Sequence, residues 1–116
     1  MSMESMIVGA LNVLVASRAY PDLAPEGALR PYIVYQQIGG DALNFIDATT
    51  PSKRNAIVQV AVWADTRVQA STVSAQVEEA LRGATALQTT VMGAAVSDYD
   101  DVTKLRGARQ NFSFWI

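Results

Sequence analysis

A nine-residue stretch in the middle of the chain, Ala56–Ala64, alternates in a way that limits the architecture of the whole protein. Its even-numbered positions are all alanine or valine, so a strand formed here has one wholly apolar face. Its odd-numbered positions include Gln59 and Trp63 and are mixed in polarity. Such a strand is typical of a sheet that helices cover on one side only. We therefore expect an α+β fold built around this strand.

The first covering helix is expected near the N-terminus. Apolar side chains recur at three- and four-residue spacing over residues 3–14, which is the pattern of an amphipathic helix. Ser2 is placed to act as its N-cap, and Glu4 lies near the positive end of the helix dipole. Pro21 marks the latest residue at which this helix can end.

A second helix is expected directly after the central strand. Asp65 or Thr66 can cap its N-terminus, and the apolar periodicity continues to about Arg82. Gly83 follows at the position where a helix commonly ends in a left-handed residue, so we expect it to be the C-terminal cap. This helix and the first should pack on the same face of the sheet.

Three further strands are expected at Tyr32–Ile38, Ala94–Val102 and Arg109–Trp115. The long connection 39–55 can hold one more short strand around Leu43–Ile46. Because the strands at both ends of the order are joined as hairpins, the sheet should be antiparallel or mixed, with about four to five strands. We expect two α-helices packed on one of its faces.

The composition restricts the class of function. The chain has 116 residues, which is the size of a single domain spanning residues 1–116, and it contains no cysteine and no histidine. It therefore lacks a thiolate, the usual general base and the commonest metal ligand, so we expect neither enzymatic activity nor a cofactor. The net charge of −2 argues against a protein that wraps nucleic acid.

The sequence also argues against membrane insertion and secretion. No apolar run approaches the roughly 20 residues that span a bilayer. The N-terminus carries Glu4 where a signal peptide would carry basic residues, so we expect a protein that is made in the cytoplasm. The last predicted strand runs to the final residues, and we expect no further binding segment beyond it.

One acidic run is the only cluster in the sequence with the chemistry to hold a hard cation. Its carboxylates are Asp98, Asp100 and Asp101, which are oxygen ligands of the type that Ca²⁺ and Mg²⁺ prefer. Alternation along a strand would point Asp101 away from the other two, so the three would not converge. We interpret the run as a solvated strand whose charges discourage edge pairing rather than as a metal site.

A basic cluster, Lys104, Arg106 and Arg109, lies across the predicted turn from these aspartates. One interpretation is cross-strand pairing, in which each exposed ion pair contributes only about 0–1 kcal/mol. The other is a charged rim that docks on a complementary ring of another assembly. The sequence leaves both interpretations open.

The long connection carries a second set of candidates for a partner interface. Phe45 and Ile46 are apolar residues in a polar loop, and they either fold back on the core or contact a partner. Lys53 and Arg54 form a small positive patch that is too small for a nucleic-acid site. We expect this loop to contact a partner protein.

Trp63 and Trp115 lie on the less apolar faces of their strands. Tryptophan is enriched at protein interfaces because it buries a large area while its one donor stays satisfied. Packing between helix and sheet explains the same pattern equally well. We therefore treat both tryptophans as interface candidates.

Several short motifs together resemble the tail completion, or tail terminator, proteins of long-tailed bacteriophages and prophages. They are Tyr-Pro at 20–21, Ala-Pro-Glu-Gly at 24–27, Pro-Tyr-Ile-Val-Tyr-Gln at 31–36, and the strand that runs into a helix at 56–65. The resemblance covers most of the chain. Its motifs are structural rather than chemical, and they supply no catalytic residues.

The resemblance implies a structural role. Such proteins form a ring, here expected to be a hexamer, that caps the tail tube, stops its polymerisation and joins the tail to the head. The implied partners are further copies of the chain, the tail tube protein and the head–tail connector protein, with DNA passing through the bore without specific binding. The implied location is the virion, after assembly in the host cytoplasm.

Two alternatives stay open at this point. The nearest is a head-completion or neck adaptor protein of the same virion, since those proteins also form small rings. The second is a small-molecule-binding or enzymatic α+β domain. A deep pocket lined by acids of perturbed pKa in the 98–101 region would favour that alternative.

Overall fold

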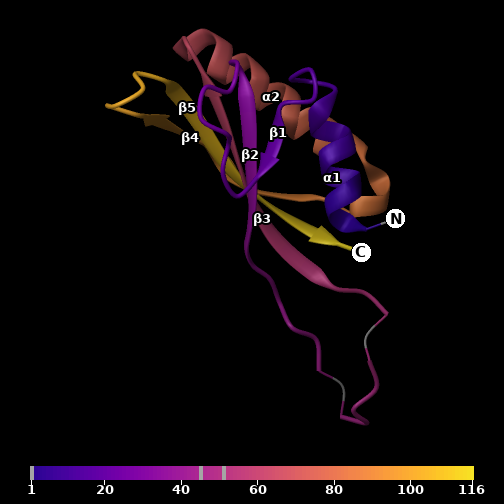
Figure 1. The fold of residues 1–116 in the computed structure, drawn as a ribbon. Helices are drawn as coiled ribbons and strands as arrows, with labels where there is room; N and C mark the ends of the chain where they lie inside the picture. The colour runs from indigo at the N-terminus through magenta and orange to yellow at the C-terminus, as the bar shows by residue number, and fades with distance from the viewer. Residues whose placement is uncertain (1, 45, 51) are drawn as a thin grey trace.

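The computed structural model describes residues 2–44, 46–50 and 52–116. Within these residues, helices α1 (Met3–Asn12) and α2 (Arg67–Gly83) lie on the same face of a five-stranded sheet (Figure 1). The strands are, in chain order, β1 (Ala19–Pro21), β2 (Tyr32–Gly39), β3 (Asn55–Ala64), β4 (Thr90–Tyr99) and β5 (Arg106–Trp115).

The strands are arranged in the order β1-β2-β3-β5-β4 across the sheet. β1 is parallel to β2, and every other pair of neighbours is antiparallel. The expected α+β class and the mixed sheet are therefore confirmed. β4 and β1 form the two edges, and β3 occupies the centre.

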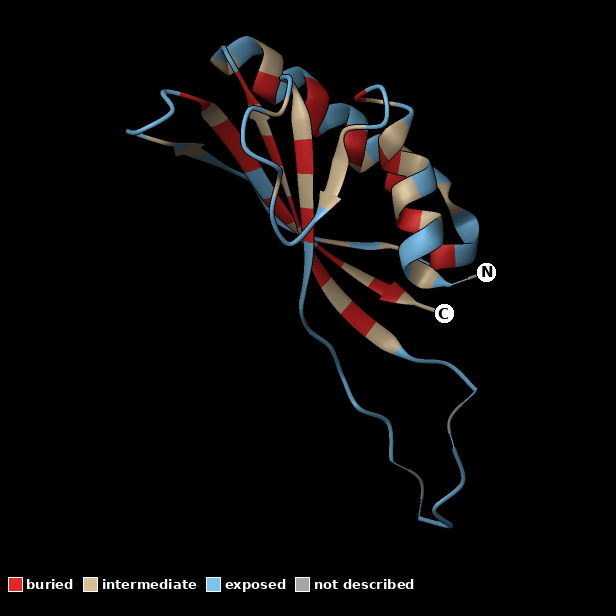
Figure 2. Cartoon of the chain, viewed as in Figure 1, coloured by how far each residue is buried: buried red, intermediate tan, exposed pale blue. Residues whose placement is uncertain are grey.

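The core lies between the helices and one face of the sheet (Figure 2). Along β3 the even-numbered residues are buried and the odd-numbered ones are half-buried, as predicted. The two phenylalanines of β5, Phe112 and Phe114, are fully buried against the same cluster. The helices contribute the buried residues Ile7, Leu11, Val73, Val77 and Leu81. None of the helices in the described ranges is long and apolar enough to cross a membrane.

The N-terminal segment differs from expectation after residue 12. Ser2 caps α1 as predicted, because its hydroxyl accepts a hydrogen bond from the Ser5 N–H at 3.1 Å. The helix ends at Asn12, and a short strand that the sequence pattern did not predict, β1, then pairs with β2. A segment of three residues that ends in proline is too short to show the alternation of apolar and polar residues from which a strand is predicted.

The C-terminal cap of the second helix was predicted wrongly. Thr66 is the N-cap, since its hydroxyl accepts from the Gln69 N–H at 3.1 Å. Gly83, however, is the last helical residue, and the following Ala84 is not left-handed. The left-handed residue is Gln88, after the 3-10 turn η1 (Thr85–Leu87). This turn places the fully buried Leu87 in the core, which explains why the chain continues winding beyond the glycine.

The last hairpin is shifted relative to its prediction. β4 begins at Thr90 rather than Ala94 and ends at Tyr99, and residues 101–103 form the turn. The pairing of β4 with β5 is interrupted between Met92 and Val96 by a bulge that contains the positive-φ residue Gly93. The short strand expected at 43–46 is also wrong for residues 43, 44 and 46, which belong to no strand, and Phe45 lies outside the described residues.

Candidate functional site

The most prominent feature of the molecule is the connection between β2 and β3. The described residues of this connection, 40–44, 46–50 and 52–54, are here called the arm; they extend away from the body and help to give the molecule dimensions of 53 × 25 × 25 Å (Figures 1 and 2). Gly40 permits this departure, because a Cβ at this position would collide with the Asn55 carbonyl oxygen. The described arm residues are all exposed.

Asn55 anchors the base of the arm. Its side-chain oxygen accepts a hydrogen bond from the Asp41 N–H at 2.8 Å. Its side-chain nitrogen donates to the Ser113 hydroxyl at 2.8 Å and to the Phe114 carbonyl at 3.0 Å. One side chain therefore ties both the start of the arm and the C-terminal strand β5 to β3.

The tip of the arm presents apolar surface to solvent. Ile46 is completely exposed, with a relative accessibility of 109%. Leu43, which lies nearer the base of the arm, is also exposed. A local turn follows, in which the Asp47 carboxylate accepts hydrogen bonds from the Thr49 hydroxyl at 2.8 Å and N–H at 3.1 Å. These bonds lower the pKa of Asp47. Ile46 thus does not fold back on the core, while the other apolar candidate, Phe45, lies outside the described residues.

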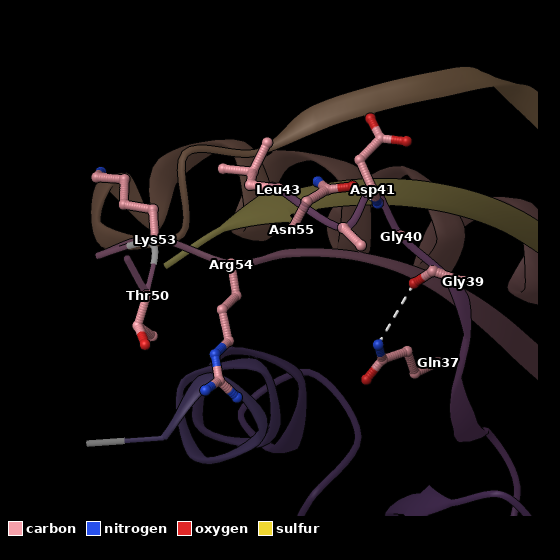
Figure 3. A pocket seen from close by; sticks show the side chains of 10 residues that line it. Gln37, Gly39, Gly40, Asp41, Leu43, Thr50, Lys53, Arg54 and Asn55 are labelled. Carbon is pink, nitrogen blue, oxygen red and sulfur yellow. Dashed lines mark hydrogen bonds between the residues drawn. The ribbon is translucent and has the colours of Figure 1, made fainter. Parts of the chain in front are cut away.

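A cleft of about 430 Å³ opens between the two sides of the arm at its base (Figure 3). Lys53 and Arg54 point in different directions there, so the expected positive patch is divided. The Arg54 N–H donates a hydrogen bond to the Ile116 carbonyl at 2.8 Å, and the Ile116 N–H donates to the Arg54 carbonyl at 3.0 Å. The cleft has cationic and amide groups that can hold a polar or anionic surface. Its lining includes Gln37, Asp41, Leu43, Thr50, Lys53 and Arg54.

The charged residues of the β4–β5 hairpin are largely paired with one another. Arg109 contacts Asp98 across the strands at 2.9 Å, and Lys104 contacts Asp101 within the turn at 3.5 Å. The guanidinium of Arg106 lies 4.7 Å from the centre of the Tyr99 ring. These contacts fit the interpretation of the basic cluster as cross-strand pairing.

The acidic run does not form the pocket that would favour an enzyme. Asp100 is a turn residue whose carboxylate accepts from the Val102 N–H at 3.0 Å, and this bond lowers its pKa. A catalytic acid would need a raised pKa instead. The nearby cleft of about 250 Å³ is lined by Thr103 and Leu105 with the 24–32 loop, and its described lining includes none of the three aspartates.

Both tryptophans lie on the face of the sheet opposite the helices. Trp63 is half-buried, and a Cβ at Gly107 would lie only 2.9 Å from its Cζ3 atom. Trp115 is half-buried and pairs in register with Asn55 at the base of the arm. The tryptophans therefore lie near opposite ends of β3 rather than in one patch.

The edge strand β4 is a further candidate surface, which the sequence pattern did not reveal. Met92, Val96 and Tyr99 are exposed along it. A groove of about 320 Å³ separates β4 from α2, and its lining residues are mostly small, among them Ser71, Ala75, Ala94 and Ala95. The uncharged run 90–97 was the available signal, but the strand was predicted to begin only at residue 94.

Comparisons with known proteins bear on the fold and on the family of this chain. A comparison of the sequence with curated proteins found no significant match. Among solved structures, a chain of the virion of a native gene transfer agent (GTA) particle matches with a TM-score of 0.58 and 15% identity. The match covers 98% of this chain and 93% of that chain, and it supports the fold.

The family comparison goes further. The family described as Tail completion protein gp17 matches residues 7–116, from the first helix to the last residue. The matched region includes the arm, the edge strand β4 and the uncovered face of the sheet. The resemblance seen in the short motifs is thereby confirmed, and with it a structural role in completing a phage tail. The chain belongs to the tail completion protein gp17 family.

Proposed function

We propose that this chain closes into a ring, expected to be a hexamer, on the end of a tail tube. The ring stops the tube from growing and offers a different surface to the head–tail connector. Its mechanism is binding, because capping a polymer requires only that the surface for the next subunit is covered. Family membership supports a role in the tail, and the shape of the subunit supports capping.

The observation that carries this proposal is the arm. The arm leaves the body (Figure 2), its described side chains are exposed, and Ile46 is completely so. Apolar groups exposed at the end of a long projection are typical of a contact made after assembly. We infer that the arm contacts a neighbouring subunit or the tube.

A ring of this kind needs two different complementary surfaces on every subunit, because its contacts are heterologous. The arm supplies one candidate. The β4–β5 hairpin, with Asp98, Lys104 and Arg106, and the tryptophan-bearing face supply others. The net charge of −2 suits a bore through which DNA passes without being held.

The two alternatives have less support. The matching family is named for tail completion, whereas a neck adaptor would act on the head. The enzymatic alternative depended on acids of perturbed pKa in a deep pocket, and Asp100 is instead a turn residue with a lowered pKa. The absence of histidine and cysteine from the sequence points the same way.

Electron microscopy of particles produced without the gene tests the proposed function. We expect free heads beside tails of uncontrolled length. Tails of normal length attached to heads would refute termination. Tails of normal length that fail to join heads would instead favour the neck adaptor.

A charge on the arm tests the contact itself. We expect Ile46→Asp to abolish tail joining, because a carboxylate cannot be buried in an apolar contact. Val13→Asp is the matched control, since Val13 is 84% exposed at the end of α1, away from the arm. If both variants support assembly equally well, the arm is not the contact.

A further inference from the structure

We propose that the arm of one subunit adds as a strand to the free edge of β4 in the next copy of this chain. The proposal rests on the ring described above and names the two surfaces that close it. It identifies the occupant of the groove between α2 and β4 as residues 41–44 of a second copy.

The first observation is the state of β4. It is a ten-residue strand at the end of the sheet, and within the described residues no other strand pairs with its outer side. Residues 90–97 contain neither a charged residue nor a proline, although proteins normally protect a long edge with such residues. The bulge around Gly93 interrupts this edge, and the regular segment that follows runs from Val96 to Tyr99. Its one charged side chain, Asp98, forms an ion pair with Arg109 within the hairpin, so the backbone of the segment stays available for pairing.

The opposite edge of the sheet is protected. β1 has only three residues and ends in Pro21, which has no backbone N–H to donate. The two edges therefore differ, and extension of the sheet is favoured at β4 alone. The β1 edge of a second copy is therefore not a suitable partner for β4. The strand that pairs with β4 must come from another segment of the chain.

The second observation is the backbone of the arm. Asp41 donates its N–H to Asn55, but among the described residues the N–H groups of Ala42, Leu43 and Asn44 have no hydrogen-bond partner in the protein. These residues are exposed and belong to no helix, strand or turn. An extended segment with free backbone groups is what β-augmentation requires.

The side chains of the two surfaces are also compatible. Ala42, Leu43 and Asn44 are uncharged. The regular segment of β4 carries one charged residue, Asp98, whose carboxylate is already paired with Arg109 on β5. Alternate residues of an added strand face opposite sides of the sheet. One side would meet Met92 and Val96, which are exposed on the face opposite the helices.

The other side would enter the groove between α2 and β4. The small side chains of Ser71, Ala75 and Ala94 leave room there for an aliphatic residue. Glu78 is the charged residue in the described lining of the groove, and the base of the arm carries the opposite charges of Lys53 and Arg54. The arm and β4 of a single subunit lie on different sides of the body (Figure 1). The two segments can therefore pair with each other only between copies.

Disulfide trapping tests the proposal directly, since the chain has no cysteine of its own. The double variant Leu43→Cys with Val96→Cys is assembled on tail tubes, or at high concentration, and oxidised with copper phenanthroline. We expect a ladder of covalent multimers on a denaturing gel. The control pair, Leu43→Cys with Val13→Cys, should give no ladder.

The outcomes separate this inference from the proposed ring. Rings seen by electron microscopy without the Leu43–Val96 cross-link overturn the inference and leave the ring standing. Cross-linked dimers from Val96→Cys alone indicate symmetric pairing of two β4 edges and also overturn it. If neither rings nor cross-links form under any condition, both the inference and the ring fail.

A charge placed on the edge supplies an independent measurement. Lysine on an edge strand opposes pairing with another strand, so Val96→Lys should raise the concentration needed for association at least tenfold. Gln36→Lys is the matched control, because Gln36 is exposed on β2, away from this edge. Sedimentation velocity measures both variants, and far-UV circular dichroism checks their folding. Equal weakening by both would place the contact on the open face and overturn the inference.

Discussion

The indole of Trp63 lies across the backbone of Gly107, on the neighbouring strand of the sheet. A Cβ added at Gly107 would lie 2.9 Å from Cζ3 and 3.0 Å from Cε3 of the ring. The residues are register partners of β3 and β5, so glycine leaves the space that the indole occupies. This contact holds the ring flat on the sheet where a partner could reach it.

Gly107→Ala should therefore displace the ring. Overpacking at such a contact costs about 1–3 kcal/mol, and we expect the free energy of unfolding to fall by about that amount. Urea denaturation measures this, and Trp63 fluorescence in a Trp115→Phe background reports the ring. Gly9→Ala is the control, because a Cβ there meets nothing within 4 Å and alanine favours the helix. Unchanged fluorescence and stability in Gly107→Ala would contradict the packing described.

Arg67 joins α2 to both strands of the last hairpin. Its guanidinium donates to the Gly107 carbonyl at 2.6 Å and to the Asp98 carbonyl at 2.8 Å. Because hydrogen bonds from charged groups are stronger than neutral ones, Arg67→Ala should lower the free energy of unfolding by about 1.5–3 kcal/mol. Arg82→Ala, which removes only an exposed pair with Glu78, should cost about 0.5 kcal/mol or less. Equal effects in thermal denaturation would show that Arg67 is not a clamp.

Gln110 is a buried polar residue that positions the carboxylate of Glu78. Its amide donates to that carboxylate at 2.8 Å and to the Gly93 carbonyl at 2.8 Å. The first bond is the main reason that the pKa of Glu78 is lowered. A lowered folded-state pKa stabilises the protein above the usual glutamate value of about 4.3, and this contribution is lost as the pH falls through the lowered value.

Gln110→Leu should raise the pKa of Glu78 towards its usual value and move the midpoint of acid unfolding to higher pH. Carbon-detected NMR titration of Glu78 measures the first effect, and circular dichroism against pH measures the second. Gln76→Leu, an exposed change on α2, serves as the control. An unchanged titration of Glu78 would contradict the assignment.

Gly40 controls the path of the chain into the arm. Its φ of +152° and its close approach to the Asn55 carbonyl both require glycine. Gly40→Ala should lower the free energy of unfolding by about 2 kcal/mol or more, since it adds a backbone clash to the conformational strain. Gly27 also has a positive φ, but a Cβ there meets nothing within 4 Å, so Gly27→Ala should cost only about 1–2 kcal/mol. Hydrogen exchange at Asp41 would show whether the arm base opens.

Much of the fold follows from local patterns. The alternation of β3 predicted a sheet with one covered face, and residues 3–14 predicted the helix that begins at Met3. The errors lie where a tertiary contact overrides a local preference. Gly83 stayed helical because burial of Leu87 continues the winding, and β1 forms because β2 supplies its hydrogen bonds.

The candidate surfaces were only partly predictable. The composition of the loop indicated that Ile46 had either to be buried or to be offered to a partner, and only the structure shows it exposed. The free edge of β4 depends on the order of strands in the sheet, which no local pattern specifies. Pairing of Arg109 with Asp98 likewise depends on the register of two strands.

The arm also makes the molecule suitable for labelling. The turn at Asp47 and Thr49 is exposed and belongs to no helix or strand, so a short epitope inserted there should leave the folded body intact. An antibody would reach that epitope in the free subunit and lose it wherever the arm becomes covered. One insertion would thus convert a projecting loop into a reporter of the moment at which a tail is finished.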